Sequence, residues 1–131
     1  MTTIPASHRA LLDGPVGVLG TIGPHGLPQV TALWFLFDDD DELVRFSLNT
    51  SRQKVKNLRA RPRASFLAID PANPYRTLEL RGHADVQPDD DYAFADRVGK
   101  KYGADLRTMD QPGDKRVVVT LHPDRVNTWG E

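Results

Sequence analysis

The stretch NTSRQKVKNLRARPRAS, residues 49–65, decides how the rest of the chain is interpreted. Thr50 followed three residues later by Gln53 is a capping-box pattern, which predicts the start of a helix. Pro62 lacks a backbone donor and disfavours helical geometry in the residue before it, so the helix should end near residue 60. The prediction is a short helix over residues 51–60.

The predicted helix carries its cations where an isolated helix would not favour them. Arg52, Lys54 and Lys56 fall in the first turns, although a helix N-terminus already presents partial positive charge. Arg52 and Lys56 are also four residues apart, so they repel each other by about 0.2–0.5 kcal/mol. A phosphate or another anion bound at the helix N-terminus would turn this repulsion into binding. A solvated cationic surface helix is the alternative, and this stretch alone favours neither interpretation.

The composition is that of an ordinary globular chain, and one domain over residues 1–131 is expected. Of its 131 residues, 39% are hydrophobic and 27% are charged, and the formal net charge is −1. It has no cysteine, which excludes disulfides and thiolate chemistry and is compatible with a reducing cytoplasm. The N-terminus lacks the apolar run of a signal peptide, and no stretch approaches the roughly 20 apolar residues of a membrane span. A cytoplasmic protein that does not bind membranes is therefore expected.

Charge is unevenly distributed along the chain. From Leu43 to Ile69 there is no Asp or Glu, and the cations gather in this segment as Arg45, Arg52, Lys54, Lys56, Arg59, Arg61 and Arg63. A nucleic-acid interface is not expected, because no aromatic residue lies between Phe46 and Phe66 to stack on bases and the remaining chain is acidic.

Strands are predicted on both sides of the basic helix. They cover residues 16–22, 27–37, 43–49, 63–70, 75–87 and 115–122, with or without a short seventh strand after residue 122. The first three should form a meander, and Gly82 should mark a bulge. Further helices are predicted over residues 5–13 and 89–102, the second one started by Pro88 and the acids behind it. Strands in sequential order with peripheral helices indicate a mainly β (α+β) antiparallel barrel.

Several kinds of active site are excluded or unsupported by the residues. There is no cysteine and no G-x-S-x-G motif, so a self-contained hydrolase is not expected. No Walker or G-x-G-x-x-G loop appears. The four histidines lack the spacing of metal ligands, so no metal site is expected. His8 is predicted on an exposed helix, His25 in a turn, and His83 and His122 on strands.

The basic stretch and its surroundings resemble a known family. The segment SRQKVKNLRARPRAS, preceded by TIGPHGLPQVTALWF, is similar to the split-barrel flavin-binding proteins of the pyridoxamine 5'-phosphate oxidase superfamily. It resembles in particular the small members that use the deazaflavin coenzyme F420. The resemblance covers nearly the whole chain, and the K-x-x-N-L-x-x-x-P-x-A core from Lys54 to Ala64 is specific to the superfamily. The implied fold is a six- to seven-stranded antiparallel split β-barrel with two to three peripheral helices.

The resemblance implies a homodimer with two cofactor sites at the subunit interface. Arg52 and Lys54 match the phosphate-binding positions, with hydroxyl and backbone contacts from Thr50 and Ser51. Lys56 and Asn57 match positions beside the phosphate and the cofactor chain. The segment along the ring system is matched by Gln29, Val30, Thr31, Ala32 and Leu33. Trp34 and Trp129 are expected in the core or in the dimer contact.

The implied activity is hydride transfer from reduced coenzyme F420 to an activated double bond of a small organic substrate. F420 is preferred over FMN because Lys56, Arg59 and Arg61 offer cations to the carboxylates of its oligoglutamate tail. No catalytic acid is assigned, and His83, Tyr75 and Arg76 are the nearest guesses. Two alternatives stay open: an FMN-binding reductase or oxidase of the same fold, and a non-enzymatic protein that stores the coenzyme.

Overall fold

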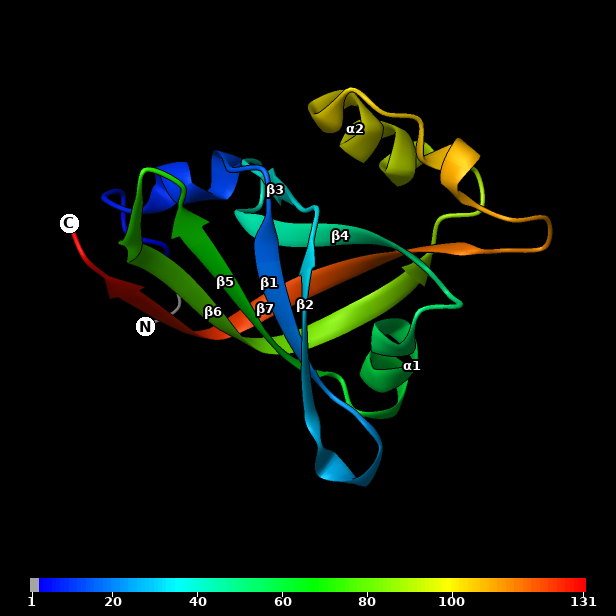
Figure 1. Ribbon diagram of the computed structural model, residues 1–131, viewed down its shortest axis with the longest axis horizontal. Coiled ribbons are helices and arrows are strands. Elements are labelled where there is room, and N and C mark those ends of the chain that lie inside the picture. The colour runs from blue at the N-terminus through cyan, green and yellow to red at the C-terminus, as the bar shows by residue number, and fades with distance from the viewer. Residues whose placement is uncertain (1–2) are drawn as a thin grey trace.

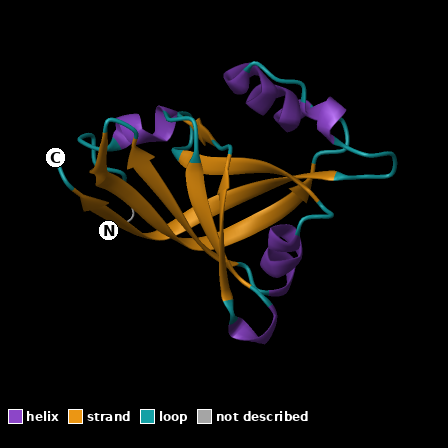
Figure 2. Cartoon of the chain, viewed as in Figure 1, coloured by secondary structure: helices purple, strands orange, loops and turns teal. Residues whose placement is uncertain are grey.

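The computed structural model describes residues 3–131, and its seven strands form one antiparallel sheet in the order β2-β1-β5-β6-β7-β4-β3. The strands are β1 (Gly17–Ile22), β2 (Pro28–Leu33), β3 (Leu36–Asp38), β4 (Leu43–Asn49), β5 (Arg63–Asp70), β6 (Asn73–Pro88) and β7 (Arg116–Trp129). The helices are α1 (Gln53–Ala60) and α2 (Ala93–Tyr102), with 3-10 turns η1 (Arg9–Asp13), η2 (Pro24–Gly26) and η3 (Leu106–Met109). The strands cross the middle of the molecule and the helices lie at its periphery (Figure 2). The predicted mainly β split barrel is confirmed.

The strand predicted over residues 27–37 is interrupted at Trp34 and Phe35, and this break separates the two edges of the sheet. The Phe35 N–H donates to the Tyr102 hydroxyl at 3.0 Å, and its carbonyl accepts from Lys101 Nζ at 2.8 Å. The Phe35 ring is buried in the core. As a result β2 pairs with β1 at one edge, whereas β3 pairs with β4 at the other. The predicted pairings of this segment with the strands before and after it are present, but its two halves make them at opposite edges of the sheet rather than within one three-strand meander.

The core fills the inside of the curved sheet with alternate residues from its strands. Phe66 lies at its centre, with ring centroids 4.9 Å from Phe35 and 5.4 Å from Phe46. All three rings are fully buried. From α1, Val55 and Leu58 reach the same cluster. These two apolar residues dock the helix on the barrel.

Residues 116–129 form one long strand instead of a strand followed by a short seventh. The predicted bulge at Gly82 is confirmed: Arg81 pairs with Arg125 but Gly82 pairs with Pro123, so Asp124 is an extra residue in β7. A Cβ on Gly82 would lie 1.9 Å from the carbonyl oxygen of His122, so the two backbones touch at this point. Pro123 is tolerated within the strand because it sits at the bulge.

The helix predicted over residues 89–102 begins later than expected, but one of the acids predicted to start it does stabilise its N-terminus. α2 begins at Ala93, and the buried carboxylate of Asp89 accepts the N–H groups of Phe94 at 3.1 Å and Ala95 at 2.9 Å. These bonds satisfy donors that a helix start leaves free. The helix ends at Gly103, whose φ of 65° is the left-handed geometry of a helix C-terminus.

Both α-helices lie at one end of the sheet, where β4 and β6 end and β7 begins (Figure 1). The described N-terminal segment and the C-terminus lie at the other end, where the ring of His8 contacts the Trp129 carbonyl oxygen at 3.2 Å. His8 is buried, so its predicted exposure is wrong. Within residues 3–131, no helix is both long and apolar enough to span a bilayer.

Candidate functional site

A cleft of about 620 Å³ opens beside α1, at the end of the sheet that carries the helices. Its walls come from β2, the end of β4, the start of α1 and the segment from η3 to β7. Six of the predicted cofactor-binding residues line it together: Thr31, Ala32, Leu33, Ser51, Arg52 and Lys54. The structure therefore brings the strand that was predicted to bind the ring and the helix start that was predicted to bind the phosphate to one cavity.

The start of α1 is held by an asparagine instead of the predicted capping box. Arg52 is the N-cap residue, and its side chain makes no capping hydrogen bond. The Ser51 N–H donates to Asn49 Oδ1 at 2.8 Å. The Thr50 N–H donates to the Lys115 carbonyl at 2.9 Å. One local and one long-range hydrogen bond thus fix the loop that presents Ser51 and Arg52 to the cleft, and the predicted Thr50–Gln53 capping box is wrong.

Lys54 is the most unusual charge in the cleft. Its side chain is half-buried, and burial together with the neighbouring Arg52 lowers the pKa of its ammonium group. In the part of the chain that the structure describes, no carboxylate lies within 4 Å of Lys54 or Arg52. A partly desolvated cation without a counter-ion is unfavourable, and a bound anion would relieve it.

Two other predicted residues of α1 do not reach the cleft. Asn57 is buried below the helix, where its Nδ2 donates to Thr21 Oγ1 at 3.0 Å and to Gln29 Oε1 at 2.9 Å. Its Oδ1 accepts from Gln53 Nε2 at 2.8 Å. Asn57 therefore joins α1 to the β1–β2 hairpin. Lys56 is exposed on the outer side of the helix.

The remaining predicted residues, Thr50, Gln29 and Val30, do not line the cleft. Gln29 and Val30 line a second hollow on the first half of β2. The guessed proton donors are absent from the cleft lining: Tyr75 is 77% exposed, Arg76 bonds Asp70 at 3.2 Å, and His83 stacks on His122 with centroids 5.1 Å apart.

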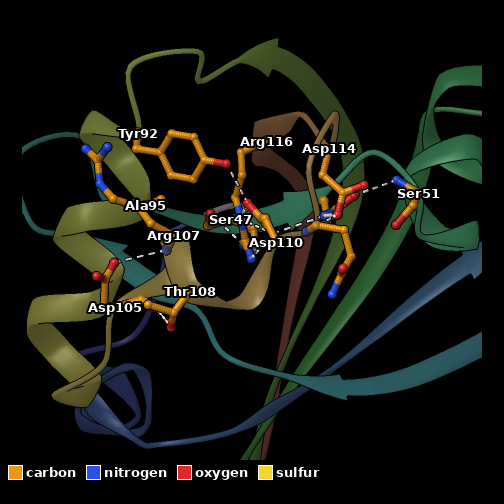
Figure 3. Close-up of polar contacts among 12 residues, drawn as sticks. Ser47, Ser51, Tyr92, Ala95, Asp105, Arg107, Thr108, Asp110, Asp114 and Arg116 are labelled. Atoms are coloured by element: carbon orange, nitrogen blue, oxygen red, sulfur yellow. Dashed lines mark hydrogen bonds and ion pairs between the residues drawn. The ribbon is translucent and has the colours of Figure 1, made fainter.

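A polar network on the wall opposite α1 was missed by the sequence interpretation. Arg116 forms hydrogen bonds to both carboxylate oxygens of Asp110 at 3.0 Å, and its side chain and that of Asp110 are only 8% and 5% exposed. Tyr92 donates its hydroxyl to the same carboxylate at 2.6 Å. Figure 3 shows these side chains between α2 and the loop at Ser51. The available signal was the spacing DQPGDKR, in which two aspartates flank a turn ahead of a strand arginine.

Asn49 connects this network to the helix start. Its Nδ2 donates to Asp110 at 3.0 Å and to Asp114 at 2.8 Å, while its Oδ1 holds the Ser51 N–H. Burial would raise the pKa of Asp110, but hydrogen bonds from Arg116, Tyr92 and Asn49 outweigh it and lower the pKa. Asp110 is therefore ionised at neutral pH and neutralises Arg116. The positive charge of Arg52 and Lys54 is left free for a ligand.

The comparisons with known proteins agree with this geometry. A family model for pyridoxamine 5'-phosphate oxidase matches residues 4–130. A solved structure named F420 reductase is 38% identical, with a TM-score of 0.81 over 95% of this chain and 98% of that one. A conserved hypothetical protein from Mycobacterium tuberculosis is 27% identical, with a TM-score of 0.76 over 98% of this chain and 86% of that one.

A more distant structure shares the fold alone. It is a heme binding protein from Mycobacterium smegmatis, 21% identical, with a TM-score of 0.72 over 99% of this chain and 56% of that one. The family match spans almost the whole sequence. The chain therefore belongs to the pyridoxamine 5'-phosphate oxidase family.

Proposed function

We propose that the protein is an oxidoreductase that binds coenzyme F420 in the cleft beside α1. The observation that carries the proposal is Lys54, a half-buried cation of the cleft with no carboxylate partner among residues 3–131. The 38% identity to a protein named F420 reductase supports the choice of coenzyme. A cavity of about 620 Å³ is within the usual range for cofactor sites.

The residues of the cleft fit an anionic tether at one end and an uncharged ring at the other. Arg52 and Lys54 lie where helix N–H groups also lack intrahelical acceptors, so they favour a phosphate. Thr31, Ala32 and Leu33 of β2 offer a largely apolar wall to a ring system. Asn49 keeps the Ser51 N–H fixed relative to that wall.

The reaction that we propose is hydride transfer to an activated double bond of a small organic substrate. The bound coenzyme supplies the hydride, and the protein supplies position and electrostatics. Asp110 is held ionised by its hydrogen bonds, so it carries no proton to donate at neutral pH. The proton that completes the reduction therefore comes from solvent or from the substrate side.

Titrations on one preparation test the coenzyme. Quenching of F420 fluorescence and of FMN fluorescence should show tighter binding of F420, followed by oxidation of reduced F420 in the presence of quinones or enones. Preference for FMN would overturn the coenzyme assignment. Tight F420 binding without turnover across such a panel would instead identify a storage protein.

A stripe of cations leads away from the cleft along α1. Arg52, Lys56 and Arg59 are spaced at i, i+4 and i+7, which places them on one face of the helix. All three are exposed, and none forms an ion pair within residues 3–131. We infer that the oligoglutamate tail of F420 follows this stripe. Arg61 is less available, because its Nε donates to the Ile22 carbonyl at 3.1 Å.

The double variant Lys56→Ala/Arg59→Ala should weaken F420 binding about two- to tenfold and leave FMN binding unchanged. Exposed ion pairs contribute about 0.2–1 kcal/mol each, and FMN has no carboxylate tail to lose them. Fluorescence titrations of both ligands at low and high salt measure the effect, which should shrink as salt rises. An equal loss for both ligands would contradict the assignment of the stripe to the tail.

The outer face of the sheet is more apolar than a free surface usually is. Cross-strand neighbours on this face are Ala32, Val18 and Leu67 in one row, and Ile69, Thr77 and Trp129 in another. Ile69 is 38% and Trp129 is 72% exposed, so of the two places expected for Trp129 the core is excluded and the dimer contact stays a prediction. A contiguous apolar face of this kind marks a protein interface. We propose that a second copy covers these rows and completes two cofactor sites in a homodimer.

The variant Trp129→Asp should shift the protein from dimer to monomer, raising the dissociation constant at least tenfold. Burying an unpaired carboxylate in an apolar contact is strongly unfavourable. Size-exclusion chromatography with light scattering over a range of concentrations measures the mass. Leu27→Asp is the control, because Leu27 is an exposed apolar residue at the hairpin tip and lies outside both rows. A wild-type monomer, or equal dissociation in both variants, would contradict the proposed interface.

A further inference from the structure

The cofactor cleft continues at its apolar end into a side pocket of about 330 Å³. Its lining consists of Val16, Ala32, Leu33, Trp34 and Met109, and all of these except Val16 also line the cleft. The side pocket is therefore part of the candidate site rather than a separate one. Ala32 also lies in a row that the proposed second copy covers, so that copy would border the side pocket along β2.

The side pocket differs from the rest of the cleft in its charge. Within residues 3–131, no charged residue lines it, and its side chains of Val16, Trp34 and Met109 are exposed. An occupant of this pocket would find no charge to pair with, so an uncharged molecule suits it. The charged residues of the cleft all lie outside the side pocket, and they are Arg52, Lys54, Asp110, Asp114 and Arg116.

The indole of Trp34 is held from behind by a second aromatic ring. It stacks on the ring of Tyr102, with centroids 4.3 Å apart and an angle of 5° between the planes. The Tyr102 hydroxyl accepts from the Phe35 N–H at 3.0 Å and donates to the Phe35 carbonyl at 3.1 Å. These two hydrogen bonds fix the ring on which Trp34 rests.

Lys101 holds the same arrangement from another side. Its Nζ donates to the Phe35 carbonyl at 2.8 Å and lies 4.0 Å from the centroid of the Phe35 ring. It also lies 4.9 Å from the centroid of the Tyr102 ring, and a cation near an aromatic face is attracted to it. The same contacts attach α2 to the sheet, so the end of this helix and the indole are held as one unit.

One face of the indole is left for a ligand. Tyr102 covers the other face, yet Trp34 is exposed and lines both the cleft and the side pocket. Its exposed area must therefore come from the free face and the ring edge. Flat rings stack on such a face, and a stacked aromatic pair is stabilised beyond the area that it buries.

We propose, on the basis of the proposed function, that Trp34 determines which substrates the site accepts. The substrate carries its activated double bond in or next to a flat, uncharged ring, and this ring stacks on the free face of the indole. Met109 and Val16 contact the rest of the molecule, and a flexible methionine adapts to substituents of different shape. Tyr102 and Lys101 do not touch the substrate; they are positioning residues that hold the indole.

Two matched ketones test this assignment. Both 4-phenyl-3-buten-2-one and 4-cyclohexyl-3-buten-2-one carry the same activated double bond and no charge, but only the first has a flat ring. The full chain is labelled with 15N and saturated with oxidised F420, which has no hydride to donate, so that NMR measures binding without turnover. The phenyl ketone should shift the Trp34 indole N–H signal saturably and bind about two- to tenfold more tightly than the cyclohexyl ketone.

Variants of the stacked pair show whether the preference comes from the ring face. Trp34→Leu should bring the two dissociation constants within about twofold of each other, because leucine keeps an apolar wall but offers no ring face. Tyr102→Leu should reduce the preference, and Tyr102→Phe should restore it because phenylalanine keeps the stacked ring. A residue with only a general structural role would change both dissociation constants equally and leave their ratio unchanged.

Two further variants complete the experiment. Trp129→Phe is the matched control, since it removes the other tryptophan of the sequence, which lies outside the side pocket, and should leave the ratio unchanged. The indole signal that remains in this variant belongs to Trp34. Met109→Asp does not depend on the folding of a Trp34 variant: it places a carboxylate at an exposed position of the side pocket and should weaken both ketones at least fivefold.

Three results would overturn the role of Trp34. The first is equal binding of the two ketones to the wild type with F420 bound, which would leave the proposed function standing. The second is an unchanged ratio in Trp34→Leu. The third is conversion of a dimer to a monomer by Trp34→Leu in light scattering, because Trp34 would then contact the second copy. Absence of F420 binding is a different failure, since it would overturn the proposed function and with it the substrate site.

Discussion

Replacing Lys54 with alanine is expected to weaken F420 binding at least tenfold, or about 1.4 kcal/mol, while the fold stays intact. Lys54 is half-buried in the cleft and has no carboxylate partner among the described residues, so the ligand phosphate would be its counter-ion. Its loss removes a charge-assisted contact in a partly desolvated site, where such contacts are strongest. Fluorescence titration of wild type and variant in the same buffer measures the change.

The controls for this experiment separate a specific contact from diffuse electrostatics. Lys100→Ala removes the same charge from the exposed side of α2 and should leave the affinity within twofold of the wild type. Circular dichroism and thermal unfolding should show that Lys54→Ala is folded, because the pKa of Lys54 is already lowered by burial and its charge does not stabilise the native state. An affinity for F420 that is the same in Lys54→Ala as in the wild type would remove the phosphate assignment.

The variant Asp110→Asn is expected to lower the free energy of unfolding by about 3–5 kcal/mol. Asp110 and Arg116 are almost fully buried, and the amide would leave the guanidinium without a counter-charge in the wall of the cleft. Urea unfolding followed by circular dichroism measures the loss. Asp96→Asn is the control, because the Asp96–Arg107 pair is 2.9 Å long but about half exposed, so its loss should cost less than 1 kcal/mol.

The pH dependence of stability provides a second measurement of the same pair. The pKa of Asp110 is lower in the folded than in the unfolded chain. Its contribution to the free energy of unfolding is therefore complete above the ordinary pKa of 3.8 and is lost as the pH falls below that value. The pKa values of Asp41, Asp70 and Asp96 are also lowered, so these groups contribute to the same pH dependence. The informative quantity is therefore the difference in the free energy of unfolding between the wild type and Asp110→Asn. This difference should shrink below about pH 4. A difference that stays constant down to pH 3 would contradict the ionised pair.

Local sequence signals predicted the elements whose causes are local. Pro62 ends α1 and Gly103 ends α2. A glycine within a strand pattern also predicted the bulge at Gly82, although the backbone that touches it belongs to the distant His122. The break at Phe35 could not be predicted this way, since its cause is the contact of its backbone with Lys101 and Tyr102, far along the chain. The strand predicted over residues 115–122 continues through Pro123, because the bulge opposite Gly82 accommodates the proline.

Some residues of the candidate site could likewise be predicted from the sequence, and others only from the fold. The cations of α1 violate the usual charge preference of a helix start, and that violation is visible in the sequence. Asp110 and Arg116 violate no local rule, and they become informative only when the fold buries them against each other and against Asn49. Asn57 matched a family position, yet its hydrogen bonds to Thr21 and Gln29 give it a place under the helix.

The strand order also has a consequence for how the protein is made. The two neighbours of β4 are β3 and β7, and β7 is the last strand to leave the ribosome. Until Arg116–Trp129 has emerged, β4 lacks its long partner and the wall of Asp110 and Arg116 is missing. Contacts between distant parts of a chain form late in folding. A coenzyme bound as proposed would therefore load only after residues 116–129 have emerged from the ribosome, and a nascent chain that lacks them would gain no protection from it.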